Sequence, residues 1–425
     1  MRRRVAVVGG GWSGLAAAVR ARQAGHDVAL YETSRQWGGR ARSEAVGALG
    51  LDNGQHILIG AYTRTLALMR EIGVDQAAVL RRLPLTLCDP HGQGLRLRSG
   101  SPLLSFARAV FGHPGWTWRD RVSLLQAASR WARAGFTCPP EMTVEALSLG
   151  IHLSVRQQLI EPLCVAALNT PATAASAQVF LRVLQEALFS GPGSADLLLP
   201  KEPLDRLLPG PAIDWLSQAG VTLRPGRRVR SIVRAGAQWR VDDDSFDGVI
   251  VACTALEAAR LVQPVDNVWS DCAQSLTYEP IVTVYLRSPG STLVSPMVTL
   301  RDGPQDPAQF AFDHGALGGV EGRFAFVVSG AASWVEQGQQ KTSDAALAQA
   351  LRAFPGGTWK TTPMIEAVRT EKRATFRCTP GLIRPSGWIA AGLVAAGDYV
   401  EGPYPATLEG AIRSGEVAVD LLDRP

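Results

Sequence analysis

Three glycines near the start of the chain have the spacing of a site for a dinucleotide diphosphate. Gly9, Gly11 and Gly14 follow the apolar run 5–8, and sequence with helical periodicity comes directly after them. Gly9 permits a tight turn, Gly11 lets a diphosphate approach the backbone because it has no Cβ, and Gly14 lets the helix pack closely on the strand. The free N–H groups at the start of that helix would then bind the diphosphate.

An acidic residue completes the pattern. Glu32 ends a second apolar run, at roughly the 20-residue spacing expected for a carboxylate that binds a ribose hydroxyl. The glycines alone would be a weak signal, but a strand, a helix and an acid in this order predict a βαβ unit that binds a dinucleotide. Trp12 and Ser13 stand between Gly11 and Gly14 and belong to the same expected site.

A second glycine motif indicates which dinucleotide is bound. Gly38, Gly39 and Arg40 follow Glu32 within the pattern Arg-x-x-Gly-Gly-Arg-x-x-Ser. The glycine pair again admits backbone close to phosphate, and the planar guanidinium of Arg40 can bind phosphate oxygens. This motif resembles the glycine doublet of flavoproteins in the amine oxidase and phytoene desaturase superfamily. It therefore favours FAD over NAD, and its position disfavours the alternative of a polar surface loop.

A stretch in the middle of the chain is expected to join the cofactor domain. Residues 229–232 and 239–241 are predicted to form a strand pair, and residues 247–252 a buried strand. In flavoproteins of this superfamily such a segment adds to the cofactor sheet. The resemblance implies that the backbone of Val229 lies near the adenine.

The C-terminal part resembles the closing motif of the same superfamily. Gly397 and Asp398 end an apolar run, and Ala406 and Thr407 precede a helical tail. In the superfamily the Gly-Asp pair lies beside the ribityl chain and the diphosphate. The next helix directs its N-terminus at the pyrimidine end of the flavin, where it stabilises the anionic reduced ring. The alternative for Asp398 is an ordinary turn residue at the end of a strand.

The composition indicates a globular protein with two domains. The chain has 425 residues, of which 46% are hydrophobic and 19% are charged. Its net charge is +5, but the sequence has no basic run interleaved with aromatic residues, so no nucleic-acid partner is expected. The six cysteines form no CxxC pair, which is typical of reduced thiols in a cytosolic protein and predicts no metal site. We interpret the N-terminus as the first strand and not as a targeting signal, and no apolar run reaches the length of a membrane span.

The predicted fold class is α/β, with a Rossmann-type FAD-binding domain and an inserted α+β substrate domain. Three segments would form the FAD-binding domain, namely residues 1–60, 200–262 and 378–425. Residues 61–199, which are mostly helical, and residues 263–377, which combine a sheet with helices, would form the substrate domain. The sequence has no second glycine motif of the first kind, so it leaves the electron donor of the flavin open.

Several further segments narrow the resemblance. They are Leu-Asp-Asn-Gly-Gln-His-Ile-Leu-Ile-Gly-Ala-Tyr at 51–62, Pro-Leu-Cys-Val-Ala-Ala-Leu-Asn-Thr-Pro at 162–171, Glu-Lys-Arg-Ala-Thr-Phe at 371–376, and Pro-Ala-Thr-Leu-Glu-Gly-Ala-Ile-Arg-Ser-Gly at 405–415. Together they resemble the squalene-associated FAD-dependent desaturases, now called hydroxysqualene dehydroxylases, over nearly the whole chain. The chain departs from that family at Tyr399, where the family usually has Trp, and in the loop before residue 405, where Gly-Pro-Tyr replaces a Gly-Leu sequence.

The resemblance implies reduction of hydroxysqualene to squalene, a step of hopanoid synthesis. Hydride from reduced FAD would add to an allylic carbon while the hydroxyl leaves as water, and the leaving hydroxyl needs a general acid. His56 is the first candidate because an imidazole titrates near neutral pH. Lys372 is the second, because relatives hold a basic group near N5 of the flavin. The alternatives are an orienting hydrogen bond for His56 and a solvated strand end for Lys372.

The same resemblance implies further binding residues. Asn53, Gly54 and Gln55 are expected beside the flavin. Four residues are expected to shape the substrate pocket: Asn169, Arg373, Tyr399 and Tyr404. For Asn169 a helix-end position is the alternative.

Two other functions are consistent with these motifs. An oxidative desaturase of phytoene or squalene would use the same flavin site to remove hydride from an allylic C–H bond. A protein that only binds prenyl chains would lack a working flavin site, and here both glycine motifs, Glu32, Arg40 and Asp398 are intact.

A triterpene substrate predicts contact with a membrane. Each buried CH2 group contributes about 0.8 kcal/mol, so an apolar tunnel can bind a C30 chain, and transit through water is costly. Residues 101–136 combine Leu, Phe and Trp side chains with arginines and are the expected docking segment. The alternative is that these helices pack on their own domain. We expect a cytoplasmic protein that is peripheral on the inner face of the membrane.

Overall fold

The computed structural model describes residues 2–44, 51–98, 100–422 and 424. Its largest sheet has six strands in the order β10-β2-β1-β14-β21-β20, and all neighbours are parallel except β20 and β21. The strands are β1 (Arg4–Val8), β2 (Asp27–Glu32), β10 (Thr222–Pro225), β14 (Gly248–Val251), β20 (Trp388–Ala390) and β21 (Leu393–Ala395). The predicted strand at 247–252 is confirmed as β14, and it lies between β1 and β21.

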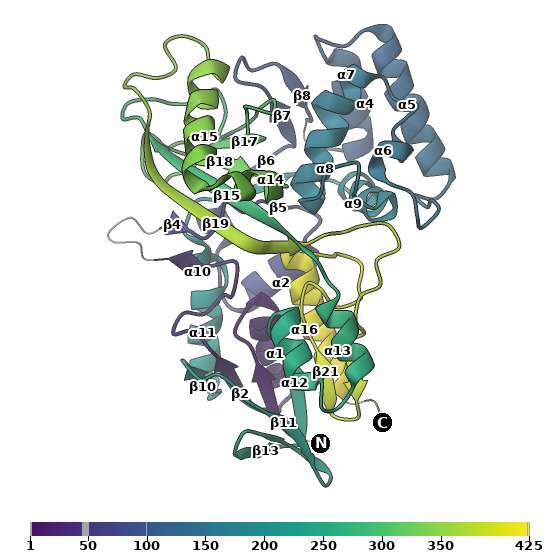
Figure 1. Cartoon of the computed structure of the whole chain (residues 1–425), viewed down its shortest axis with the longest axis vertical. Helices are drawn as coiled ribbons and strands as arrows, with labels where there is room; N and C mark the ends of the chain where they lie inside the picture. The colour runs from purple at the N-terminus through teal and green to yellow at the C-terminus, as the bar shows by residue number, and fades with distance from the viewer. Residues whose placement is uncertain (1, 45–50, 99, 423, 425) are drawn as a thin grey trace.

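Both faces of this sheet are covered, which is why its strands are nearly continuous apolar runs. Val5 and Val7 of β1 pack towards helices α1 (Trp12–Gln23), α11 (Pro209–Gln218) and α16 (Leu408–Leu422). Ala6 and Val8, which point the other way, pack towards a three-stranded sheet and helix α12. Figure 1 shows this layered part in the lower half of the molecule, with both chain ends near it.

The three-stranded sheet corrects one boundary. Its strands are β11 (Ile232–Ala235), β12 (Gln238–Val241) and β13 (Asp244–Phe246), and helices α12 (Ala255–Val262) and α13 (Asn267–Gln274) follow β14. The first strand begins at residue 232 and not at residue 229. The backbone N–H groups of Arg230 and Ser231 donate to Asp242 Oδ1, at 2.8 and 3.0 Å, and this side-chain acceptor replaces a strand partner there.

A second large sheet stands above the first. It has five antiparallel strands in the order β16-β17-β18-β15-β19. They are β15 (Tyr278–Arg287), β16 (Met297–Thr299), β17 (Phe310–Asp313), β18 (Arg323–Val328) and β19 (Met364–Phe376). Helix α15 (Gln339–Ala353), preceded by α14 (Ala332–Gln337), packs its apolar face on this sheet. In Figure 1 the long strands β15 and β19 run from the upper part of the molecule to its middle.

Helices dominate the rest of the upper half (Figure 1). They are α4 (Pro102–Gly112), α5 (Trp118–Arg133), α6 (Val144–Leu147), α7 (Leu153–Val155), the π-helix η1 (Arg156–Ile160), α8 (Glu161–Leu168) and α9 (Ala177–Phe189). The start of α5 is encoded locally, because Thr117 and Asp120 form a reciprocal capping box. No helix among the described residues is long and apolar enough to cross a bilayer.

The remaining elements are short. They are β3 (Ser43–Glu44), β4 (Leu51–Asp52), β5 (Leu58–Ile59), α2 (Thr63–Glu71), α3 (Gln76–Val79), β6 (Leu80–Leu83), β7 (Thr86–Cys88), β8 (Gly94–Arg96), β9 (Leu197–Pro200) and α10 (Leu204–Leu207). Helix α2 lies in the stretch assigned from sequence to the substrate domain, yet it contacts α16: Arg64 pairs with Glu416 at 2.7 Å, and Thr65 donates to Glu409. The fold class is the predicted one, and the domain boundaries stay a prediction.

Candidate active site

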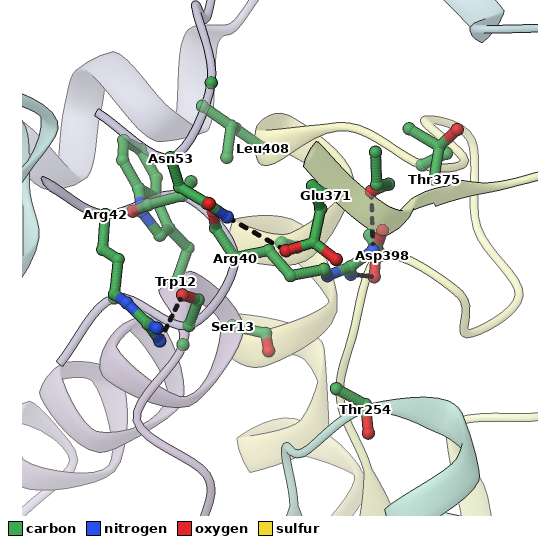
Figure 2. A pocket seen from close by; sticks show the side chains of 18 of the residues that line it. Trp12, Ser13, Arg40, Arg42, Asn53, Thr254, Glu371, Thr375, Asp398 and Leu408 are labelled. Atoms are coloured by element: carbon green, nitrogen blue, oxygen red, sulfur yellow. Dashed lines mark hydrogen bonds and ion pairs between the residues drawn. The ribbon is translucent and has the colours of Figure 1, made fainter. Parts of the chain in front are cut away.

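A cavity of about 550 Å³ is lined by residues of both large sheets. Most of the residues selected from the sequence meet in its wall, although they come from distant parts of the chain. These are Gly9, Gly11, Trp12, Ser13, Glu32, Gly38, Gly39, Arg40, Asn53, Gly54, Gln55, His56, Asn169, Val229, Gly397, Asp398, Ala406 and Thr407. Figure 2 shows how Arg40, Asn53, Glu371 and Asp398 converge from separate segments of the chain.

The two glycine motifs lie side by side and form a cradle. Gly38 N donates to Gly10 O at 2.8 Å, and Gly11 forms a bridge with Gly38. A Cβ placed on Gly11 would have no atom closer than Gly39 Cα, at 3.9 Å, so the space beside Gly11 is open. No side chain caps the N-terminus of α1. An open backbone next to an uncapped helix N-terminus is the geometry that a diphosphate needs, so these residues fit the predicted cofactor.

Gly14 has a different role. A Cβ on Gly14 would lie 1.8 Å from Gly9 O, so this glycine allows the turn from β1 to pack against α1. Gly14 is accordingly absent from the cavity wall.

Glu32 is held at the rim by backbone donors. Its carboxylate accepts from Gly10 N at 2.8 Å and from Ser34 N at 2.7 Å. A carboxylate offers about four acceptor positions, so two remain for hydroxyl groups. This arrangement orients the first glycine turn and leaves an acceptor for a ribose.

Arg40 connects three segments of the cavity wall. Its guanidinium pairs with Asp398 at 2.5 Å and donates to Ala374 O at 2.9 Å. Asn53 donates to Arg40 O at 3.1 Å and to Glu371 Oε2 at 3.0 Å, as the dashed lines in Figure 2 mark for the contact with Glu371. The motif after β2, the end of β19 and the end of β21 are therefore held together around one arginine.

His56 lines the cavity, but its state differs from the expected acid. Its Nδ1 lies 2.9 Å from Gly54 O, and because a carbonyl oxygen only accepts, Nδ1 carries the hydrogen. Burial lowers the pKa of the His56 imidazole, and the positive charge of Arg40 lowers it further. The ring is neutral at pH 7, and its Nε2 is an acceptor. These contacts favour the orienting alternative for His56 over the general acid, and its role stays a prediction.

Lys372 and Arg373 lie outside the cavity wall. Both side chains are exposed, although Glu371, Ala374 and Thr375 of the same segment line the cavity. Strand β19 is irregular here, because Ile281 pairs with Glu371 whereas Glu279 pairs with Thr375, so the residues between Glu371 and Thr375 bulge out of the ladder. The roles of Lys372 as acid and of Arg373 as substrate residue are therefore not supported by their positions.

Asn169 is a structural tie in the cavity wall. It ends α8 in the left-handed conformation, with φ of 47°. Its Nδ2 donates to Thr375 Oγ1 at 3.0 Å and to Glu279 O at 3.2 Å, and its Oδ1 accepts from Gly330 N at 2.7 Å. Because these bonds occupy the amide, the helix-end alternative describes Asn169 better than substrate contact.

Tyr399 is also corrected. It is 2% exposed, and it is absent from the walls of both cavities described here. Its ring packs over Gly397, where a Cβ would lie 2.4 Å from a ring carbon. The Tyr399 hydroxyl has no hydrogen-bond partner among the described residues.

A second cavity, of about 210 Å³, adjoins the first. The two share wall residues, namely Ile57, Tyr62, Ala166, Ala167, Phe310 and Thr407. Tyr404, expected in the substrate pocket, lines the second cavity. Apart from a few polar groups, its wall is aliphatic and aromatic and includes Phe106, Trp131 and Phe180. An apolar cavity that opens into a cofactor cavity is suited to a long hydrocarbon.

Many residues of these walls were not selected from the sequence, among them Glu371, Tyr62 and Glu186. Glu371 stands next to the residues that were selected at 372 and 373, and the bulge that separates them depends on the pairing of β19 with β15, which no sequence pattern marks. Tyr62 ends the family segment at 51–62 but was given no role, whereas Glu186 lies in an amphipathic helix with no motif around it. No cluster of His, Cys, Asp or Glu in the described part of the chain is arranged to hold a metal ion.

Comparison with known proteins identifies the family. The family model described as flavin containing amine oxidoreductase matches residues 12–422. Hydroxysqualene dehydroxylase of Rhodopseudomonas palustris is 28% identical over 99% of both chains. A probable zeta-carotene desaturase of Synechococcus elongatus is 28% identical over 68% of this chain and 66% of its own length.

Solved structures agree on the fold. An oxidoreductase from Methanosarcina mazei has a TM-score of 0.71 at 15% identity, with 98% of this chain and 99% of that chain covered. The predicted resemblance, the Rossmann-type fold and the FAD cofactor are thus confirmed. The chain belongs to the flavin containing amine oxidoreductase family, and it is an FAD-dependent oxidoreductase.

Proposed function

We propose that this enzyme reductively removes the hydroxyl group of a long polyprenyl allylic alcohol. The specific reaction that we propose is the conversion of hydroxysqualene to squalene, which the family resemblance assigns to hopanoid synthesis. The observation that carries the proposal is the apolar second cavity, which shares Tyr62, Phe310 and Thr407 with the cofactor cavity. The full-length similarity to hydroxysqualene dehydroxylases supports it.

The reaction replaces a C–O bond by a C–H bond. When bound, reduced FAD supplies the hydride for the carbon, while the hydroxyl takes up a proton and leaves as water. The chain's own residues bind and orient. Gly11 and the N-terminus of α1 would hold the diphosphate, and Glu32 would accept from a ribose hydroxyl, while Arg40 pairs with Asp398 in the same wall.

The second cavity orients the hydrocarbon and excludes water. Its wall includes Trp131, Phe136 and Phe180, none of which is more than 8% exposed. A dry wall protects a reacting allylic centre from competing attack by water.

A single-turnover experiment tests the proposal. Holoenzyme is photoreduced without oxygen and mixed with hydroxysqualene, and the products are separated by gas chromatography. We expect one squalene per reduced flavin. The variant Lys372→Ala is the matched control and should retain activity, because that side chain lies outside the cavity wall. Reduced enzyme that makes no squalene would contradict the proposal, and oxidised enzyme that desaturates a carotene would favour the desaturase alternative.

We further propose that α4 docks on an anionic membrane. Leu103, Leu104 and Phe111 on this helix are 47%, 61% and 47% exposed, and Trp118 nearby is 63% exposed. The rings of Phe111 and Trp118 lie 5.9 Å apart. Arg108, also on α4, is exposed and suits an anionic lipid surface.

The same helix borders the second cavity. Leu103 and Phe106 line that cavity, so α4 separates it from the outside. A membrane-bound α4 would let a triterpene enter the cavity from the bilayer without crossing water.

Liposome flotation tests the docking. Wild-type protein should float with vesicles of phosphatidylglycerol and less with phosphatidylcholine. The double variant Leu104→Ser, Trp118→Ser should stay in the soluble fraction. Ile383→Ser, at a position that is 77% exposed and lies outside this segment, is the control and should float like the wild type. Wild-type protein that never floats, or a control that behaves like the double variant, would contradict this docking.

A further inference from the structure

The wall of the second cavity contains a small polar cluster. Four of its lining residues carry a hydroxyl or a carboxylate: Tyr62, Glu186, Tyr404 and Thr407. We refer to them as the tyrosine–glutamate cluster. Tyr62 and Thr407 also line the cofactor cavity, so the cluster lies where the two cavities meet. A cavity for a plain hydrocarbon gains nothing from polar groups in its wall, because burying them costs free energy.

The cluster is held in place from three segments of the chain. The rings of Tyr62 and Tyr404 meet edge to face, with centroids 6.4 Å apart. Arg413 lies over the Tyr404 ring at 4.8 Å and is fixed by Glu409 at 2.7 Å. Thr407 donates to Tyr404 O at 2.9 Å. Groups fixed in this way lose little freedom when a ligand binds.

The fourth member comes from α9. Glu186 accepts a hydrogen bond from Ser190 Oγ at 2.9 Å, which orients its carboxylate. Burial raises the pKa of Tyr404 to about 12, and the charge of Glu186 and a hydrogen bond to its carboxylate add to the shift. Burial also raises the pKa of Tyr62, to which the charge of Glu409 contributes. Both phenols are therefore neutral at pH 7. The Tyr404 phenol donates to the carboxylate of Glu186, so its oxygen and the free acceptor positions of that carboxylate face the cavity, and Tyr62 keeps a hydrogen to donate.

We propose that the tyrosine–glutamate cluster is the subsite for the oxygen of the substrate alcohol, and that it makes the enzyme prefer an alcohol to the parent hydrocarbon. A hydroxyl can donate to Glu186 and accept from a tyrosine, and the rest of the chain fills the apolar wall. Because Tyr62 and Thr407 line both cavities, a substrate oxygen bound at this cluster would put its carbon at the boundary between the second cavity and the cofactor cavity. This inference rests on the proposed function and adds which groups recognise the reacting end.

Equilibrium binding tests the subsite without turnover. Oxidised holoenzyme without a reductant is titrated separately with hydroxysqualene and with squalene, and the fluorescence of the protein is followed, since Trp131 lines the cavity. Wild-type enzyme should bind the alcohol at least about tenfold more tightly than the hydrocarbon. Tyr404→Phe and Glu186→Gln should each lower this preference by about threefold to tenfold and leave the affinity for squalene unchanged.

Controls separate the possible failures. Tyr285→Phe removes a phenol that donates to Asp52 O outside both cavity walls, so it should keep the full preference. The flavin content of each variant, read from its absorbance, reports correct folding. If the wild type binds both ligands equally, or if Tyr404→Phe and Glu186→Gln both retain the preference, the subsite is refuted and the proposed function stands. If the wild type binds neither ligand, the proposed function fails and the subsite with it.

Discussion

The cradle beside α1 allows a glycine to be changed without disturbing the fold. Gly11 has φ of −74° and ψ of 178°, a conformation that alanine adopts readily. A Cβ there meets no atom closer than 3.9 Å, because the space belongs to the cavity. Gly11→Ala should therefore produce a folded protein whose cofactor site is partly filled by a methyl group.

The expected magnitudes follow from this geometry. Alanine stabilises relative to glycine by about 0.4–1 kcal/mol through the unfolded chain, and a poorer N-cap costs a similar amount, so stability should change little. For FAD, the methyl group pushes the diphosphate away from backbone N–H groups. Losing two hydrogen bonds to a charged phosphate costs at least about 3 kcal/mol, which is roughly a hundredfold in Kd.

Gly14→Ala is the contrasting variant. Its Cβ would lie 1.8 Å from Gly9 O, so the turn or the helix must move, and such overpacking costs about 1–3 kcal/mol or more. The melting temperature of flavin-free protein and the Kd for FAD, measured by quenching of flavin fluorescence, separate the two effects. Gly11→Ala should lose affinity at an unchanged melting temperature, whereas Gly14→Ala should melt lower. Affinity of Gly11→Ala within threefold of the wild type would refute a diphosphate at Gly11.

Three further variants test single groups. Tyr399→Phe should stabilise the protein by about 1 kcal/mol in thermal melts, because it removes a buried hydroxyl that has no hydrogen-bond partner among the described residues. Tyr285→Phe should destabilise the protein, because it removes the hydrogen bond to Asp52 O. The same change of melting temperature in both variants would contradict this reasoning. Burial raises the pKa of Asp52 to about 6, above its unfolded value, so its contribution to stability is full below about pH 4 and is lost as the pH rises through 6. Asp52→Asn should therefore melt higher relative to wild type at pH 7.5 than at pH 4.5, and a constant difference would exclude the shift. Because the pKa of His56 is lowered, His56→Asn should leave the pH dependence of the rate unchanged between pH 6.5 and 8, and loss of an ionisation in that range would restore His56 as an acid.

Local sequence motifs were sufficient to predict the cofactor half of the site. Gly9, Gly11 and Glu32 could be assigned from sequence because their roles depend on backbone conformation and on spacing within one βαβ unit. The walls of the cavities show that these residues do meet, together with Arg40 and Asp398.

The reacting half of the site was predicted less well, for physical reasons. Lys372 was chosen for its chemistry, but the direction of a side chain on an edge strand depends on which neighbour the strand pairs with. The tautomer of His56 depends on one carbonyl, that of Gly54, and Tyr399 became buried through packing on Gly397. None of these contacts has a pattern in the sequence.

The sequence by itself determined that this chain binds FAD on a Rossmann-type sheet, because turn geometry and helix N-termini are encoded over a few neighbouring residues. Only the tertiary structure decided which polar groups meet in the wall of the apolar cavity. Tyr62, Glu186 and Tyr404 lie far apart in the sequence, and although Tyr404 was expected in the substrate pocket, nothing in the sequence places it beside Glu186 and Tyr62. Their meeting depends on how α2, α9 and the segment before α16 pack together, and such long-range packing is a property of the whole fold.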